Sequence, residues 1–184
     1  MEMTPEESKR LGVLHAYGLL DTNFEDRYDR LVRLASSMLG TPIALISLVD
    51  TNRQWFKAAV GLKARETPRN ISFCTHAIES KELFIVLDAT KDDRFSNNPL
   101  VTGDPNIRFY AGAPLIGFKG QAIGTLCVID RKPRSDFTTE QQQVLRDLAD
   151  TLVDLFDLRL ALSKARALKR ELKPIALQLT QLAK

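Results

Sequence analysis

The chain has 184 residues, of which 44% are hydrophobic and 27% charged, and its formal net charge is +3. This composition excludes an intrinsically disordered chain, and two cysteines are too few for a disulfide framework. The polar N-terminus lacks a signal-peptide pattern and no apolar run is long enough to cross a bilayer, so we expect a cytoplasmic protein with no membrane insertion.

Basic residues gather near the C-terminus. Between residues 159 and 184 they outnumber the single acidic residue, Glu171. This segment contains no aromatic residue and no known nucleic-acid-binding module, so its charge is typical of a solvated helix face. We therefore predict that the protein has no nucleic-acid partner.

The first predicted element is a helix within residues 1–18. Thr4 and Glu7 have the spacing of a capping box, and Pro5 occupies the first helical position between them. Gly18 supplies the residue type that commonly ends a helix. These signals predict an N-terminal helix that stops shortly before Gly18.

A second helix is predicted to end at Gly40. Thr22 and Glu25 form another capping-box pattern, and apolar residues then recur at helical spacing. The period changes afterwards: residues 42–50 and 53–61 are apolar, β-branched or aromatic runs separated by a turn. This pattern predicts a β-hairpin.

The middle of the chain is less regular. Ser72 is a candidate cap for a short helix, residues 83–88 have strand composition, and residues 89–107 have turn composition. A loop of that length inside a compact domain is usually functional or a lid. Two further strands are predicted at 108–118 and 121–130, joined by a tight turn.

The last predicted element is a long helix from Thr138 to about Leu172, where Pro174 is expected to stop or kink it. Its apolar residues recur every three or four positions, which is close to a heptad seam. The seam comprises Leu148, Leu152, Leu155, Leu158, Leu162, Ala165 and Leu172.

Together the elements predict an α+β domain with two N-terminal helices, a central antiparallel sheet of about five strands and a long C-terminal helix. The strands follow one another as hairpins, without regular crossover helices. A Rossmann or flavodoxin-like winding is therefore excluded.

Four blocks, in order along the chain, resemble a bacterial GAF domain. The blocks are residues 19–62, 66–78 ("ETPRNISFCTHAI"), 88–115 and 124–134 ("GTLCVIDRKPR"). More narrowly, they are similar to the subgroup found at the input end of diguanylate cyclases and sensor histidine kinases. The resemblance divides the chain into an N-terminal helix (1–18), a GAF domain (19–158) and a C-terminal helical extension or linker (159–184).

The resemblance implies a GAF-like, PAS-related fold, with an antiparallel sheet of five or six strands, helices on one face and a ligand-sized cavity on the other. It also implies terminal helices that bundle with those of a second subunit, and hence a homodimer. GAF domains sense small molecules such as cyclic nucleotides, bilins, haem or metabolites. The fold alone does not name the ligand or cofactor, which stays unknown.

Cys74 and His76 form a notable pair because the chain has only two residues of each type. Nucleophilic catalysis requires a base and an orienting third group, and the sequence places neither beside Cys74. Cys-x-His is not a common zinc-ligand spacing, and Cys127, the other soft ligand, is interpreted as a buried core residue. We predict no catalytic residue and no metal site.

A ligand-pocket wall accounts for more residues. Aromatic residues stand beside cations on two predicted strands, and the amides after Ser72 can receive an anionic group at a helix start. Alternation along a strand places Trp55 and Phe56 on opposite faces, so only one of them can face the cavity. The predicted ligand-binding residues are Trp55, Lys57, Ser72, Phe73, Cys74, His76, Asp88, Arg94, Arg108 and Tyr110.

These observations predict a non-catalytic sensory or regulatory GAF domain that binds a small molecule and signals through its terminal helices in a homodimer. Two alternatives stay open. One is a thiol-based redox enzyme or sensor that uses Cys74, and the other is a dimerisation module with no ligand. If the chain belongs to a longer protein, the output domain could be a cyclase or a kinase.

Overall fold

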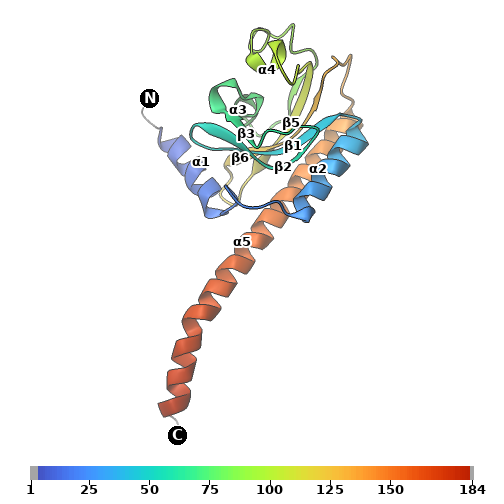
Figure 1. The fold of residues 1–184 in the computed structure, drawn as a ribbon. Helices are drawn as coiled ribbons and strands as arrows, with labels where there is room; N and C mark the ends of the chain where they lie inside the picture. The colour runs from blue at the N-terminus through green and yellow to red at the C-terminus, as the bar shows by residue number, and fades with distance from the viewer. Residues whose placement is uncertain (1–3, 183–184) are drawn as a thin grey trace.

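The computed structural model describes residues 4–182, with side chains for residues 4–174. An antiparallel sheet of six strands, ordered β3-β2-β1-β6-β5-β4, organises this part of the chain (Figure 1). The elements are α1 (Pro5–Ala16), α2 (Asp26–Leu39), β1 (Ile43–Val49), β2 (Arg53–Val60), β3 (Glu66–Pro68), the 3-10 turn η1 (Arg69–Ile71), α3 (Phe73–Ala77), β4 (Phe84–Val86), α4 (Pro99–Thr102), β5 (Phe109–Ile116), β6 (Ala122–Asp130) and α5 (Thr139–Leu182).

The sheet is buried on both faces. We call the face that packs against α1, α2 and α5 the helix face, and the opposite face, beneath α3, α4 and the segment between β4 and β5, the cover face (Figure 1). Alternation along β1 sends Ala44 and Ile46 to the helix face and Ile43 and Leu45 to the cover face. The predicted α+β class with a sheet of five or six strands is confirmed.

The long helix α5 has two distinct halves. Leu145, Ala149, Leu152 and Phe156 are buried against the domain at spacings of three and four residues. The side chains of residues 161–174 are exposed except for Ala167, and this C-terminal part of the helix extends away from the domain (Figure 1). We call the part of α5 from Arg159 onward its free half. Leu152, a member of the near-heptad seam in the sequence, is therefore part of the domain core.

Several local signals in the sequence are confirmed by the structure. The Thr4 hydroxyl accepts a hydrogen bond from the Glu7 amide at 3.2 Å and caps α1. The Ser72 hydroxyl accepts one from the Thr75 amide at 3.2 Å and caps α3. Gly40 ends α2 with φ of 60°, a conformation that glycine adopts without strain.

Two signals have a different outcome. α2 begins at Asp26 without a side-chain cap, because the Thr22 hydroxyl binds the Leu19 carbonyl and the Lys57 ammonium instead. Of the two outcomes expected at Pro174, a stop is excluded, because α5 continues to Leu182. A proline inside a helix removes one backbone hydrogen bond and crowds the carbonyl four residues earlier, and the helix continues here despite that cost.

Candidate functional site

The centre of the cover face is a buried pair of thiols. The Cys74 sulfur, on α3, lies 3.9 Å from the Cys127 sulfur, on β6. The hydroxyls of Thr125 and Tyr110 donate hydrogen bonds to the Cys74 sulfur at 3.2 and 3.3 Å. Both cysteines are free and buried, so the chain keeps its only two thiols in one enclosed polar spot.

The surroundings of the two thiols separate their acidities. Burial by itself raises the pKa of Cys74, but hydrogen bonds from Cys127, Ser47, Thr125 and Tyr110 outweigh it and leave that pKa below its ordinary value. For Cys127, the neighbouring Cys74 and burial both raise the pKa. Cys74, which receives the two hydroxyl donors, is thus the more acidic thiol of the pair.

A chain of buried polar side chains continues from the thiols toward β3. Gln54 is its centre: its carbonyl oxygen accepts from the hydroxyls of Ser47, at 3.2 Å, and Ser72, and its amide donates to Thr67 at 2.7 Å. Each partner comes from a different element, so the chain links β1, β2, β3 and the start of α3. Buried polar groups are stable only when paired in this way.

Gly112 on β5 makes room for the Tyr110 hydroxyl. A Cβ atom at position 112 would collide with the phenol ring of Tyr110. The glycine therefore lets the phenol lie flat on the sheet and reach Cys74, which a larger residue would prevent.

Aromatic rings fill the space around α3. Phe73 stacks on Phe95 with ring centroids 3.8 Å apart, and Phe84 and Tyr110 lie 5.9 Å apart, edge to face. The half-buried His76 ring packs against Phe95 at 5.1 Å. These rings belong to the protein, so the space that the sequence assigned to a ligand is largely occupied by side chains.

A small cavity remains beside this cluster, with a volume of about 120 Å³. Its lining is mostly apolar, with Gln54, Thr67 and Asp104 as the polar members. The other lining residues are Ile43, Leu45, Phe56, Leu62, Ala64, Leu100, Pro105, Ile107 and Ile129. None of the ten residues predicted from the sequence lines this cavity.

The structure brings together five of the ten ligand-binding residues that the sequence predicted. Ser72, Phe73, Cys74, His76 and Tyr110 lie around α3 on the cover face.

The other five lie elsewhere or act locally. Arg94 is paired with Asp92 at 2.6 Å and lies over the Phe84 ring at 4.8 Å, at the edge of the aromatic cluster. Asp88 holds a turn by accepting from the Thr90 hydroxyl at 2.7 Å. Arg108 donates to the Val101 carbonyl at 2.8 Å and so braces α4.

Trp55 and Lys57, which the sequence assigned to the ligand-binding residues, lie on the helix face, away from the cover-face cavity. The alternation of β2 points Phe56 into the cavity and turns Trp55 and Lys57 toward α2. Lys57 is fully buried, and its ammonium contacts the Glu25 carboxylate at 2.9 Å and the Asn23 carbonyl at 2.7 Å. It is a structural cation.

Glu25 connects this cation to α5. The same carboxylate oxygen accepts from the Arg159 guanidinium at 2.6 Å, where α5 leaves the domain. Burial opposes ionisation of Glu25, but the neighbouring positive charges outweigh it and hold its pKa below the ordinary value. Burial lowers the pKa of Lys57. We call Lys57, Glu25 and Arg159 the charged link.

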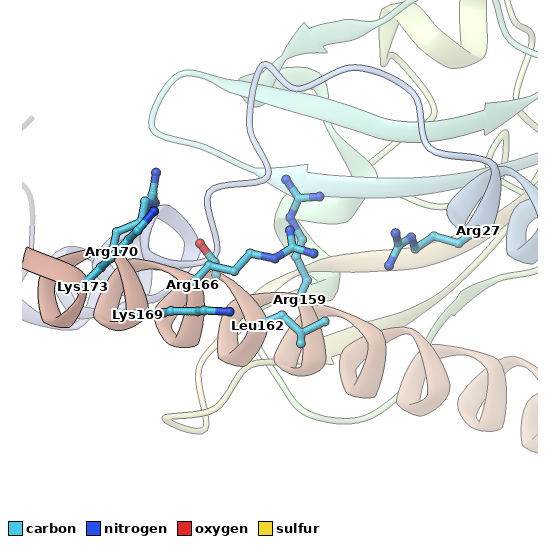
Figure 2. Close-up of a pocket in the computed structure, with 8 residues that line it drawn as sticks. Arg27, Arg159, Leu162, Arg166, Lys169, Arg170 and Lys173 are labelled. Atoms are coloured by element: carbon cyan, nitrogen blue, oxygen red, sulfur yellow. The ribbon is translucent and has the colours of Figure 1, made fainter. Parts of the chain in front are cut away.

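Next to the charged link, a groove of about 720 Å³ runs along the free half of α5 (Figure 2). Its cations form a row on one side of the helix, and Arg27 of α2 lies at the end of the row that is next to the domain (Figure 2). The lining residues are Arg27, Arg159, Leu162, Ser163, Arg166, Lys169, Arg170 and Lys173. The row corresponds to the C-terminal excess of positive charge in the sequence.

The sequence reasoning did not connect Cys127 with Cys74, and it missed Gln54, Phe95 and Thr125. Alternation along β6 puts Thr125 and Cys127 on one face, and this was the available signal. Among the described residues, no group of three or more His, Cys, Asp or Glu side chains could hold a metal ion. Within the same residues, no helix has both the length and the apolar character of a membrane span.

Comparison with known proteins identifies the family. The model of the GAF domain matches residues 23–153. The chain belongs to the GAF family. Over 144 residues, this GAF domain is 46% identical to "Cyclic di-GMP phosphodiesterase PA2567" of Pseudomonas aeruginosa. The alignment covers 78% of this chain and 24% of the relative, so the chain spans about a quarter of that protein's length.

Solved structures share the fold. A GAF domain of a phosphoenolpyruvate-protein phosphotransferase from Acinetobacter has a TM-score of 0.62 at 18% identity, covering 86% of this chain and 97% of that one. A domain of a sensor histidine kinase protein from Sinorhizobium meliloti scores 0.60 at 19% identity, covering 80% and 99%. A free methionine-R-sulfoxide reductase from Neisseria meningitidis scores 0.59 at 16% identity, covering 85% and 93%. At these identities the likeness concerns the fold alone, and the family supports a sensory or regulatory role.

Proposed function

We propose that this GAF domain is a non-catalytic regulatory module, in which a small molecule bound in the cover-face cavity shifts the position of α5. One observation carries the proposal: cavity-lining and helix-packing side chains alternate along the same strands. Ile43 and Leu45 line the cavity, whereas Ala44 and Ile46, between and beyond them, pack toward the helices. A strand displaced by a ligand therefore moves both layers.

The cavity limits the ligand. At about 120 Å³ it is well below the roughly 300–1,000 Å³ of pockets that hold drug-sized molecules. The occupant in this arrangement is a small, mainly apolar molecule with a hydrogen-bonding group facing Gln54 and Thr67. A cyclic nucleotide would require α3 and α4 to move away from the sheet.

The charged link provides the route to α5. Phe56 lines the cavity, and the next residue on β2, Lys57, binds Glu25 on the other face. Glu25 in turn binds Arg159 at the point where α5 leaves the domain. A shift of β2 is thereby passed to α5 through two ion pairs, in addition to the apolar packing.

The free half of α5 supports a homodimer. Leu158, Leu162 and Leu172 are each about half exposed, with exposed fractions of 53%, 46% and 51%. Arg159, Arg166 and Lys173 recur every seven residues beside this seam. Two antiparallel copies would bring these cations together, and a parallel pair avoids that repulsion, so we propose parallel pairing.

The output is proposed from the relative. Because the similar P. aeruginosa protein is named a cyclic di-GMP phosphodiesterase and is much longer, we propose that this module regulates an enzyme of cyclic di-GMP turnover. A thiol enzyme is disfavoured by burial: Cys74 is 2% exposed, which denies a substrate of amino-acid size access to the sulfur. Two reductases with this fold share 14% and 16% identity with the chain.

A thermal-shift screen of small metabolites tests ligand binding, since a molecule that binds only the folded state raises the melting temperature. Leu100→Trp fills the cavity, and Leu87→Trp, at an exposed site, is the matched control. We expect a compound that stabilises the wild type and Leu87→Trp by several degrees but not Leu100→Trp. Stabilisation of all three proteins would place the ligand elsewhere, and a screen without hits would favour the ligand-free dimerisation module.

Analytical ultracentrifugation tests the dimer separately. Leu162→Glu places a charge in the seam, and Leu87→Glu places one on the domain surface. We expect the first variant to weaken the dimer at least tenfold and the second to leave it unchanged. A wild-type protein that is monomeric at high micromolar concentration would contradict the proposed pairing.

A further inference from the structure

We propose that Cys74 and Cys127 are an oxidisable thiol pair, which hydrogen peroxide or an equally small peroxide converts into an intramolecular disulfide. Their sulfurs are 3.9 Å apart, and a disulfide bond is about 2.05 Å long. Closing this gap requires α3 to move roughly 2 Å toward β6, or a smaller movement combined with side-chain rotation. The inference depends on the thiols alone and not on the proposed ligand.

The two positions are built for this contact. Cys74 lies in the first turn of a five-residue helix that Ser72 anchors through its bond to Gln54. Cys127 lies in the middle of β6, paired on both sides with β1 and β5. The strand thus holds one sulfur fixed, and the short helix carries the other toward it.

The reaction balances with peroxide as the oxidant. The Cys74 thiolate attacks one peroxide oxygen, the O–O bond breaks, hydroxide leaves, and Cys74 becomes a sulfenic acid. The Cys127 sulfur then attacks the Cys74 sulfur, the S–O bond breaks, and the sulfenic oxygen leaves as water. Two thiols lose two electrons and two protons, and one peroxide becomes two waters.

The assignment of roles follows from the hydrogen bonds. Cys74 receives donors from Thr125 and Tyr110, which stabilise its thiolate and lower its pKa after the opposing effect of burial. Cys127 has a raised pKa and serves as the resolving thiol. A thiolate next to a protonated thiol is the arrangement that attack followed by resolution requires.

Burial selects the oxidant. Cys74 is 2% exposed and Cys127 is fully buried, so a bulky disulfide such as oxidised glutathione cannot align with either sulfur. Peroxide is close to water in size and can enter when the cover face fluctuates. The bond would tie α3 to β6 and so fix the cover above the cavity.

The test is mass spectrometry of the intact full chain after hydrogen peroxide treatment, with all remaining thiols alkylated in denaturant. We expect the wild type to lose the mass of two hydrogen atoms and to resist alkylation, and peptide mapping to join Cys74 to Cys127. Dithiothreitol should restore both thiols. Cys127→Ser should instead gain one oxygen at Cys74, which dimedone traps.

Cys74→Ser is the matched partner variant and should remain unoxidised at Cys127 under the same treatment. Wild-type thiols that stay fully alkylatable would overturn the proposal, as would disulfides that form only between chains. Equal oxidation of the two single variants would overturn the assigned roles. Because both substitutions are nearly isosteric, circular dichroism before oxidation verifies that each variant is folded.

Discussion

Buried polar groups occur on both faces of the sheet, but they differ in chemistry. On the helix face, the cations of Lys57 and Arg159 are paired with the single carboxylate of Glu25. On the cover face, Cys74 and Cys127 are groups that can be neutral, ionised or oxidised, and hydroxyls and an amide surround them. The same strands thus carry a fixed connection to α5 on one side and a chemically variable centre on the other.

The difference indicates how the fold separates two tasks. The ion pairs of the charged link have short contacts and favour one position of α5. Breaking one of them is costly, because the remaining charge then has fewer partners in a partly buried place. Thiols and hydroxyls are weaker partners and permit rearrangement of the cover. In the proposed mechanism, the cover face is therefore the place where a ligand or an oxidant acts, and the helix face is the place where the result is transmitted.

The largest expected effect comes from removing the buried cation of the charged link. Lys57→Met should lower the free energy of unfolding by about 3 kcal/mol, because it removes the buried cation that donates to the Glu25 carboxylate, the Thr22 hydroxyl and the Asn23 carbonyl. Urea denaturation provides the measurement. Arg30→Met, which removes an exposed ion pair with Asp26, is the control and should cost less than about 0.5 kcal/mol. Equal losses in the two variants would mean that the link does not hold α5.

A smaller effect is expected from acid at the contact between α1 and η1. The Arg10 hydrogen bond, opposed by burial and assisted by Arg69, lowers the pKa of Glu7 from 4.5 to about 2. Because the folded pKa is depressed, this contribution is complete above pH 4.5 and is lost as the pH falls toward 2. After solvent screening it amounts to roughly 2 kcal/mol.

Urea denaturation across this pH range measures the acid effect. Glu7→Gln should flatten the dependence, and Glu6→Gln, exposed on the same turn, should leave it as in the wild type. The oxidation of the thiol pair should be unaffected by Glu7→Gln. If Glu7→Gln and the wild type lose stability in parallel on acidification, another carboxylate carries the effect.

The smallest stability effect is expected at the cover face, where it is accompanied by a change in reactivity. Thr125→Val removes one hydroxyl donor to Cys74 and should cost about 1 kcal/mol. Loss of that donor raises the pKa of Cys74, so peroxide oxidation near neutral pH should slow severalfold. Stopped-flow or timed alkylation gives the rate. Thr102→Val, whose hydroxyl binds only a backbone carbonyl on the surface, should oxidise at the wild-type rate.

The sequence predicted the helices and strands better than it predicted which face of the sheet each side chain lies on. The hairpin of β1 and β2, the caps at Thr4 and Ser72, and the stop at Gly40 depend on local spacing, which a sequence displays directly. Which face of β2 meets the cavity is not local. The neighbouring strand β1 is buried along its whole length and, apart from Ser47, is apolar on both sides, so its pattern does not show which face meets the helices. The sequence therefore did not show that Trp55 and Lys57 face α2.

The contact between the two thiols could not be predicted from local residue spacing. Cys74 and Cys127 are 53 residues apart, and their contact exists only because α3 folds back over β6. The cavity likewise depends on the segment between β4 and β5, which the sequence shows only as a long loop. By contrast, the basic row on α5 was visible in the sequence, because charge at helical spacing does not depend on tertiary packing.

The free half of α5 also has a mechanical consequence. From Arg159 to Leu182 the helix extends roughly 35 Å, at about 1.5 Å per residue. If a helix of this length tilts by about 5° where it leaves the domain, its far end moves by about 3 Å, close to the diameter of a water molecule. In the proposed mechanism, small adjustments at the charged link would thus be enlarged, without any further chemistry, into displacements large enough to separate or join groups at the far end.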